Sequence, residues 1–121
     1  MASIFEATAG KLIGPTTGGT VTQATSKATG VTLNAASGQI TLDDAALAAA
    51  AEVTFAVTNS EIAATDVVVV NHSSAGTAGA YLVQANTIAA GSFAITVANL
   101  SAGSLGEAIV LSFVALKGAS S

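Results

Sequence analysis

From Thr20 onward, large apolar residues alternate with small or polar ones. The segment 52–58 places Val53, Phe55 and Val57 between glutamate, threonine and alanine residues, and the segment 92–99 repeats the pattern. A two-residue period sends successive side chains to opposite faces of a β-strand. Turn-forming residues interrupt the alternation at short intervals, which is typical of antiparallel all-β proteins. We therefore predict a sandwich of about eight antiparallel strands, of the jelly-roll type.

The expected strands share this alternation and are separated by residues that favour turns. They span residues 20–26, 30–34, 39–42, 52–59, 66–72, 80–86, 92–99 and 107–116. The four consecutive valines at 67–70 predict a strand that is buried on both faces. The segment 43–51 is rich in alanine behind Asp43, so we expect a short helical turn there that bridges the two sheets.

The same alternation predicts the core between the two sheets. The core candidates are Val31, Leu33, Ile40, Leu42, Val53, Phe55, Val57, Val67, Val69, Leu82, Phe93, Ile95, Val97, Ile109, Leu111 and Phe113. The opposite face of the last strand is also apolar, because Val110, Val114 and Leu116 lie on it. Large exposed apolar surface usually marks a protein interface, so we expect the chain to form oligomers.

The first 19 residues differ from the rest of the chain. They contain large apolar residues without alternation and end in the turn-forming run 14–19, which includes Pro15. We predict an extended N-terminal arm over residues 1–19 and one β-sandwich domain over residues 20–121. The predicted interface residues are Ile4, Phe5, Leu12, Ile13, Val68, Val70, Val110, Val114 and Leu116.

Charge and cysteine content exclude several classes of function. Charged residues make up 8% of the chain, against roughly 25% in an ordinary soluble domain. Three lysines and no arginine face seven carboxylates, which argues against binding to nucleic acid or to anionic lipid. The longest clean apolar run, 45–51, is far shorter than the roughly 20 residues of a spanning helix, so no membrane insertion is expected. The chain has no cysteine and does not begin like a signal peptide, so we expect it to stay in the cytoplasm where it is made.

We expect no catalytic, metal-binding or cofactor-binding residues, and therefore no enzyme. His72 is the only histidine, and Asp66 lies six residues before it, roughly 20 Å away along an extended strand. Asp43 and Asp44, with Glu52, offer oxygen ligands for a hard cation, but backbone capping by aspartate is the favoured interpretation.

Several segments give the chain a resemblance to a known group of proteins. They are residues 18–34, 38–41, 55–60, 64–70, 76–81 and 102–111, which together extend over about Gly18 to Gly118. These segments resemble a recurrent module in virion proteins of tailed bacteriophages. The resemblance implies a small β-sandwich that decorates a capsid or forms part of a head or tail fibre.

The leading hypothesis from this resemblance is a capsid decoration or cement protein. It would form a homotrimer, bind the major capsid protein between capsid subunits and stabilise the head. It would lie on the virion surface after assembly in the host cytoplasm. The alternative is a head-fibre or tail-fibre module whose loops 71–79, 87–91 and 100–106 bind host-surface glycans, since loops on rigid scaffolds carry recognition. An enzyme that uses His72 is the third hypothesis.

Overall fold

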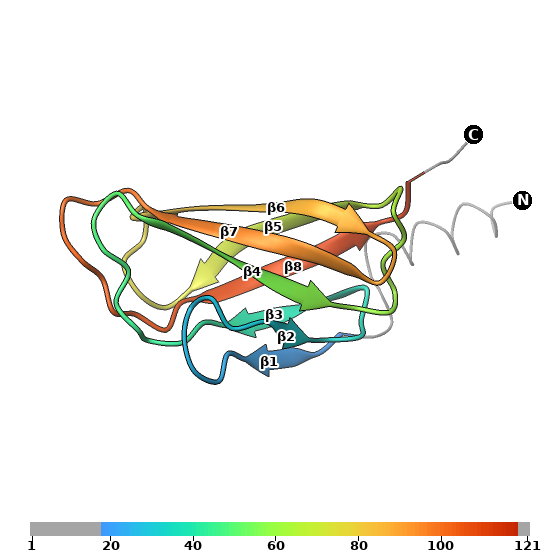
Figure 1. The fold of residues 1–121 in the computed structure, drawn as a ribbon, viewed down its shortest axis with the longest axis horizontal. Coiled ribbons are helices and arrows are strands. Elements are labelled where there is room, and N and C mark those ends of the chain that lie inside the picture. Colours follow the sequence, from blue (N-terminus) through green and yellow to red (C-terminus); the bar gives the residue numbers. More distant parts are fainter. Residues whose placement is uncertain (1–17, 119–121) are drawn as a thin grey trace, which may run out of the picture.

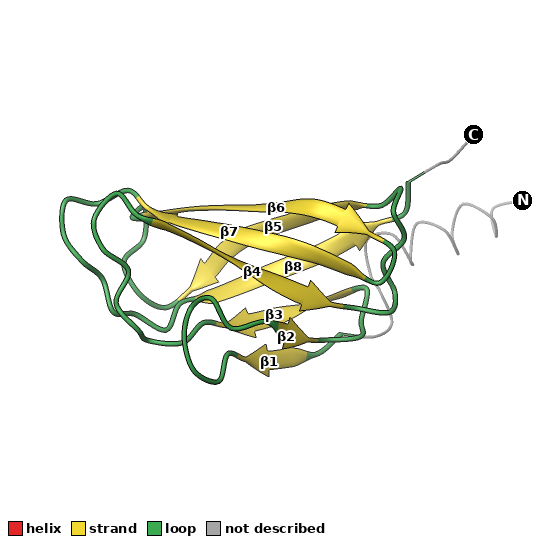
Figure 2. Ribbon diagram, in the orientation of Figure 1, coloured by secondary structure: helices red, strands yellow, loops and turns green. Residues whose placement is uncertain are grey.

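A computed structural model describes residues 18–118, and within that range the fold contains only β-strands, turns and loops (Figures 1 and 2). The strands are β1 Thr20–Thr22, β2 Val31–Thr32, β3 Ser37–Thr41, β4 Glu52–Thr58, β5 Val67–Ser74, β6 Tyr81–Ala89, β7 Ser92–Asn99 and β8 Val110–Leu116. The predicted all-β fold with eight strands is confirmed. The boundary between an arm and the sandwich at residue 19 stays a prediction, although the first strand does begin at Thr20.

The strands form two four-stranded sheets that face each other. One sheet has the order β1-β3-β8-β5, here called the β8 sheet, and the other has the order β2-β4-β7-β6, here called the β7 sheet. This arrangement confirms the predicted sandwich, and the jelly-roll type stays a prediction. Two pairs, β1 with β3 and β2 with β4, are parallel, which the prediction of an antiparallel fold did not include. They are parallel because successive strands in this part of the chain lie alternately in the two sheets. After crossing to the other sheet and back, the chain runs through the first sheet again in its original direction.

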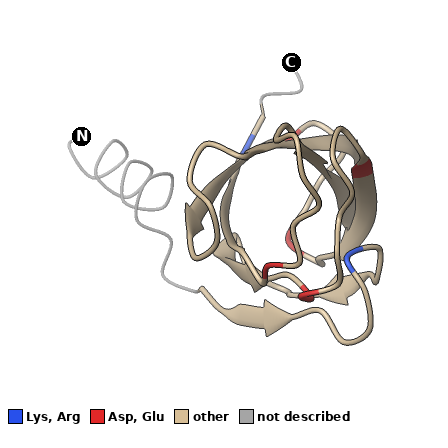
Figure 3. Cartoon of the chain, turned by 90° about the vertical axis from the view of Figure 1, so that its left-hand side faces the viewer, with Lys and Arg blue, Asp and Glu red and all other residues tan. Residues whose placement is uncertain are grey.

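The core lies between the two sheets and is built from the inward residues of β3, β4, β7 and β8. Phe55, Phe93, Ile95, Val97 and Leu111 are almost completely buried. The rings of Phe93 and Phe113 join the two sheets, with centroids 5.4 Å apart. At one side of the sandwich β5 and β6 lie next to each other without pairing, so the end-on view in Figure 3 shows strands around the whole core.

The predicted inward residues of β5 and β6 are wrong. Val67, Val69 and Leu82 were expected in the core, but they are 55%, 50% and 53% exposed. Val68 and Val70 instead pack against the core. The reason is that a run of valines has no alternation, so only pairing with β8 decides which residues turn inward. That register places Val68 opposite Ala115 and Val70 opposite Phe113, both buried, and in β6 it likewise places Val83 opposite Val97.

The helical turn predicted for residues 43–51 is also wrong. This segment is an irregular loop in which Leu47 forms an isolated antiparallel bridge with Leu105. The carboxylate of Asp43 accepts a hydrogen bond of 2.8 Å from the backbone nitrogen of Ala45, so Asp43 caps a turn and not a helix. Asn99 donates to the carbonyl of Leu47 at 2.8 Å. These tertiary hydrogen bonds outweigh the intrinsic helix propensity of alanine, which is a weak preference at this length.

Candidate functional site

The chemically versatile side chains gather at one end of the sandwich, where β5 ends and β6 and β8 begin. His72 lies near the end of β5 and Tyr81 at the start of β6, and their rings meet edge to face with centroids 5.5 Å apart. Glu107 precedes β8 and accepts a hydrogen bond of 2.7 Å from the Tyr81 hydroxyl. Thr77, from the loop between β5 and β6, donates to the same carboxylate through its hydroxyl and its backbone nitrogen. We call this end the His72 end.

A depression of about 240 Å³ lies beside this cluster. It is lined by His72, Tyr81 and the turn that follows β5, namely Ser73, Ser74, Ala75, Gly76, Ala78 and Gly79. Ala75 and Gly76 both have positive φ angles, of 64° and 74°, which is strained for alanine. Two side chains contact the backbone of this turn, because Glu107 binds Thr77 and His72 lies within hydrogen-bond distance of the carbonyls of Ser74 and Ala75.

The polar groups of the cluster form hydrogen bonds with one another within the chain. Hydrogen bonds from Tyr81 and Thr77 lower the pKa of Glu107, against a smaller opposing effect of burial, so the carboxylate is ionised at neutral pH. Burial, together with the bond to Glu107, raises the pKa of Tyr81, so its phenol stays protonated. The Nε2 atom of His72 lies 3.0 Å and 2.6 Å from the carbonyl oxygens of Ser74 and Ala75. Each of these groups therefore has a hydrogen-bond partner within the chain.

Lys27 is a buried lysine that joins three segments at the same end of the molecule. It is 3% exposed, and its amine donates to the carbonyl oxygens of Asp43, Ala45 and Glu107, the last two at 2.8 Å. Burial lowers the pKa of Lys27, while the nearby carboxylates of Asp43, Asp44 and Glu107 act in the opposite direction. All three N–H donors of the ammonium group are therefore used in holding loops together.

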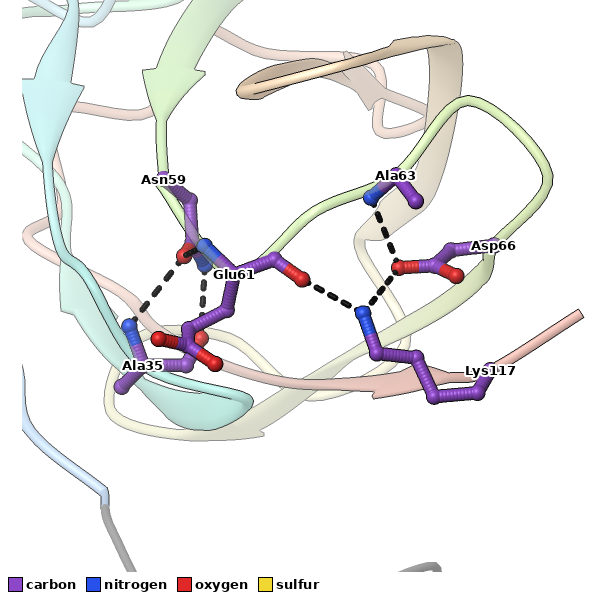
Figure 4. A network of polar contacts seen from close by, with 6 residues as sticks. All are labelled: Ala35, Asn59, Glu61, Ala63, Asp66 and Lys117. Carbon is purple, nitrogen blue, oxygen red and sulfur yellow. Dashed lines mark hydrogen bonds and ion pairs between the residues drawn. The ribbon is translucent and has the colours of Figure 1, made fainter.

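The opposite end of the sandwich contains a second polar network, shown in Figure 4. The completely buried side chain of Asn59 donates to the carbonyl of Ala35 at 2.6 Å and accepts from the nitrogens of Ala35 and Glu61. Asp66 is also buried, and it pairs with the exposed Lys117 at 2.7 Å. Asp66 and His72 therefore lie near opposite ends of β5 and have separate partners. We call this end the Asn59 end.

Three residues that hold loops in place were not predicted from the sequence to do so, namely Lys27, Asn59 and Asn99. Asn99 is completely buried and donates to the carbonyls of Leu47 and Gly103, in the same way as Asn59 at the other end. A usable signal was present, because both asparagines directly end an alternating strand and precede a turn. Lys27 had no such signal, since an isolated lysine in a polar loop is ordinarily exposed.

The outward faces of the two sheets are almost free of charge. Among the strand residues of the described range, Glu52 is the single charged residue, and the other charged residues of that range lie in loops (Figure 3). The outward face of the β7 sheet consists mainly of small residues, including Thr54, Ala56 and Thr96. Charged groups are depleted at the centres of protein interfaces, and both faces share this low charge.

The β8 sheet has an apolar strip on its outward face, near the Asn59 end. Val67 lies opposite Leu116, and Val69 lies opposite Val114. Val67 and Val69 are half exposed, whereas Val114 and Leu116 are partly buried. We call these four residues the β5–β8 strip.

The predicted interface residues fall into three groups according to where they lie in the structure. Val110, Val114 and Leu116 lie on the outward face, as the alternation of β8 indicated. Val68 and Val70 face the core, so their places on the surface are taken by Val67 and Val69. The remaining four, Ile4, Phe5, Leu12 and Ile13, lie outside the described residues.

The loops expected to bind glycans in the alternative hypothesis do not share one surface. Residues 71–79 and 100–106 meet at the His72 end, where the nitrogen of Leu100 donates to the carbonyl of Ala80. Residues 87–91 lie at the Asn59 end, where the nitrogen of Gly91 donates to the carbonyl of Ile62. A single recognition surface can therefore include two of these loops and not the third.

The described part of the chain contains no group of three acidic or histidine side chains placed to hold a metal ion. Over residues 18–118 no helix has the length and apolar character needed to cross a membrane. Comparison with protein-family models, with curated proteins and with solved structures finds no match to this chain.

Proposed function

We propose that this chain is a structural protein of a bacteriophage particle, a capsid decoration protein that forms a homotrimer and binds the major capsid protein. The observation that carries the proposal is the near absence of charge on the outward faces of both sheets. Such faces can be dehydrated at low cost, because removal of a charge from water is the most expensive part of forming a contact. The resemblance of the sequence to virion proteins of tailed bacteriophages favours a bacteriophage particle as the one that the chain belongs to.

A decoration protein has to gain stability from many small contacts. Burial of apolar surface contributes about 25 cal/mol per Å², and small outward residues such as Ala56 and Ala94 let another surface approach closely. When one subunit of a trimer is bound, the others bind at a high effective concentration. A modest contact per chain is then sufficient for firm attachment to a capsid.

The first test is the copy number of the chain relative to the major capsid protein, measured by quantitative mass spectrometry of purified virus particles. Hundreds of copies per particle support decoration of the whole capsid. A few tens or fewer overturn it and favour the alternative, a fibre module that binds host-surface glycans. The specific observation behind that alternative is the depression at the His72 end.

The second test asks whether the uncharged faces make the contact. Ala56→Asp adds a charge to the outward face of the β7 sheet, and Asn71→Asp adds one to the outward face of the β8 sheet, outside the β5–β8 strip. The matched control, Ala102→Asp, adds the same charge in an exposed loop. We expect at least one face variant to lose co-sedimentation with capsids that lack the protein, while the control binds as the wild type does. Normal binding by both face variants would contradict the proposal.

The trimer is tested separately by light scattering coupled to size-exclusion chromatography. The expected mass is three times the 11.6 kDa of one chain. A protein that stays monomeric at high concentration and does not bind capsids would end the proposal.

A further inference from the structure

We propose that the β5–β8 strip is covered in the free protein by the N-terminal segment of the same chain, with Leu12 and Ile13 as the residues that contact it. The strip is the set of half-exposed and partly buried apolar side chains Val67, Val69, Val114 and Leu116. This inference concerns the isolated chain and does not depend on the proposed function.

The size of the strip favours a short segment over a folded partner. It is two strands wide and about three residues long, which is roughly 10 Å by 10 Å. A stable interface between folded proteins buries about 800 Å² on each partner. A second folded copy placed on the strip would therefore have to bury mostly the polar residues around it, such as Asn71 and Ser112. A short segment that presents one pair of large apolar side chains matches the strip without that cost.

The position of Gly18, where the described chain begins, places the N-terminal segment within reach. A side chain at Gly18 would lie 3.7 Å from Ser37, which pairs with Val114, and Val114 pairs with Val69. The strip thus lies two to three strand spacings from Gly18, about 10–14 Å. Ile13 precedes Gly18 by five residues, which span about 17 Å when extended. Leu12 and Ile13 are therefore the first large apolar residues able to reach the strip, and the remaining pair, Ile4 and Phe5, comes later along the same path.

Attachment within one chain is favoured by concentration. A short flexible linker gives an effective concentration in the millimolar range, so at ~10 μM protein the segment of the same chain is favoured by roughly a hundredfold over that of another chain. Neither partner is charged, since Leu12, Ile13 and all four residues of the strip are apolar. The contact is therefore expected to persist at high salt.

The test uses the full chain, which has no native cysteine to interfere. The double variant Ile13→Cys/Val69→Cys is oxidised mildly at ~10 μM and examined by non-reducing electrophoresis and intact mass. The matched control is Ile13→Cys/Leu82→Cys, because Leu82 is equally exposed but lies on the outward face of the other sheet. We expect an intramolecular disulfide in most chains of the first variant and at least tenfold less in the control.

Other outcomes of this test overturn the inference. Disulfide-linked dimers would show that a second copy supplies the segment. Equal cross-linking in both variants would show a segment without a preferred site, and no cross-linking would show that it lies elsewhere.

If the cysteine variants fail to fold, a variant outside the sandwich gives an independent measurement. Leu12→Ser/Ile13→Ser should increase the fluorescence of a dye that binds apolar surface and speed amide exchange in β5, while the serine substitutions Ala7→Ser/Ala9→Ser should leave both unchanged. Unchanged fluorescence and exchange in the first variant would overturn the inference.

Discussion

Replacement of Lys27 by methionine removes the donor for three backbone carbonyls while keeping a long, flexible side chain in the same space. The amine of Lys27 is the shared partner of Asp43, Ala45 and Glu107 in two loops that are far apart in sequence. A buried acceptor that loses its partner costs about 1–3 kcal/mol. Three such losses would cost up to about 9 kcal/mol if no water replaced the amine.

Two effects reduce this figure. The hydrogen bonds are only partly buried, so water can reach some of the carbonyls. Removal of the charge also relieves the desolvation that lowers the pKa of Lys27. We therefore expect Lys27→Met to lower the free energy of unfolding by about 2–4 kcal/mol, which is a large fraction of the 5–15 kcal/mol typical of a domain.

The assay is urea denaturation followed by circular dichroism, since the chain has no tryptophan for fluorescence. Thr25→Met is the matched control, because it introduces methionine at an exposed position of the same loop. The control should change stability by less than about 0.5 kcal/mol. An unchanged midpoint for Lys27→Met, at an unchanged slope, would refute the view that this lysine holds the loops together.

Three further experiments test the core, the turn after β5 and the carboxylate of Glu107. Phe55→Ala, at a residue 2% exposed, should lower stability by about 3–5 kcal/mol in the same assay, and a loss below 1 kcal/mol would contradict its burial. Gly76→Ala should lower the free energy of unfolding more than Gly79→Ala does. Both glycines have positive φ, but only at Gly76 would a methyl group meet other atoms, 2.6 Å from Ile109 and 2.8 Å from Glu107. Equal losses of stability would argue against that close contact. Glu107 has a folded-state pKa below its ordinary 4.5, so it stabilises the fold above that pH and loses the effect as pH falls through the lower value. The unfolding free energy of the wild type should therefore fall more steeply between neutral and acidic pH than that of Glu107→Gln, and parallel pH curves would contradict this.

Where alternation is strict, the sequence was sufficient to predict the structure. β7 was predicted from Ser92 to Asn99 and has those bounds, with Phe93, Ile95 and Val97 buried as expected. The same holds for β4 to within one residue. Large apolar residues at every second position leave only one orientation with a buried face, so local pattern and tertiary packing agree.

Where the pattern is uniform, the sequence was insufficient. The valines of 67–70 are identical, so nothing local shows that Val68 and not Val67 turns inward; pairing with β8 decides this. The alanines of the segment 43–51 favour a helix in isolation, but contacts with the distant Leu105 and Asn99 determine their conformation. The polar contacts of Lys27 were hidden for the same reason, because their acceptors are backbone atoms that any residue could provide.

The place of β8 in its sheet sets the order in which the protein can be completed. β8 is the last strand of residues 18–118, yet it lies between β3 and β5 and is the partner that joins them. Without β8, the β7 sheet can still form from β2, β4, β6 and β7, while the other three strands of the β8 sheet lack their central partner. The β8 sheet is complete only when β8 pairs with both neighbours, and until then the facing edges of β3 and β5 are open to pairing with other chains. A chain truncated before Val110 would therefore be prone to aggregation, even though it contains seven of the eight strands of the described range.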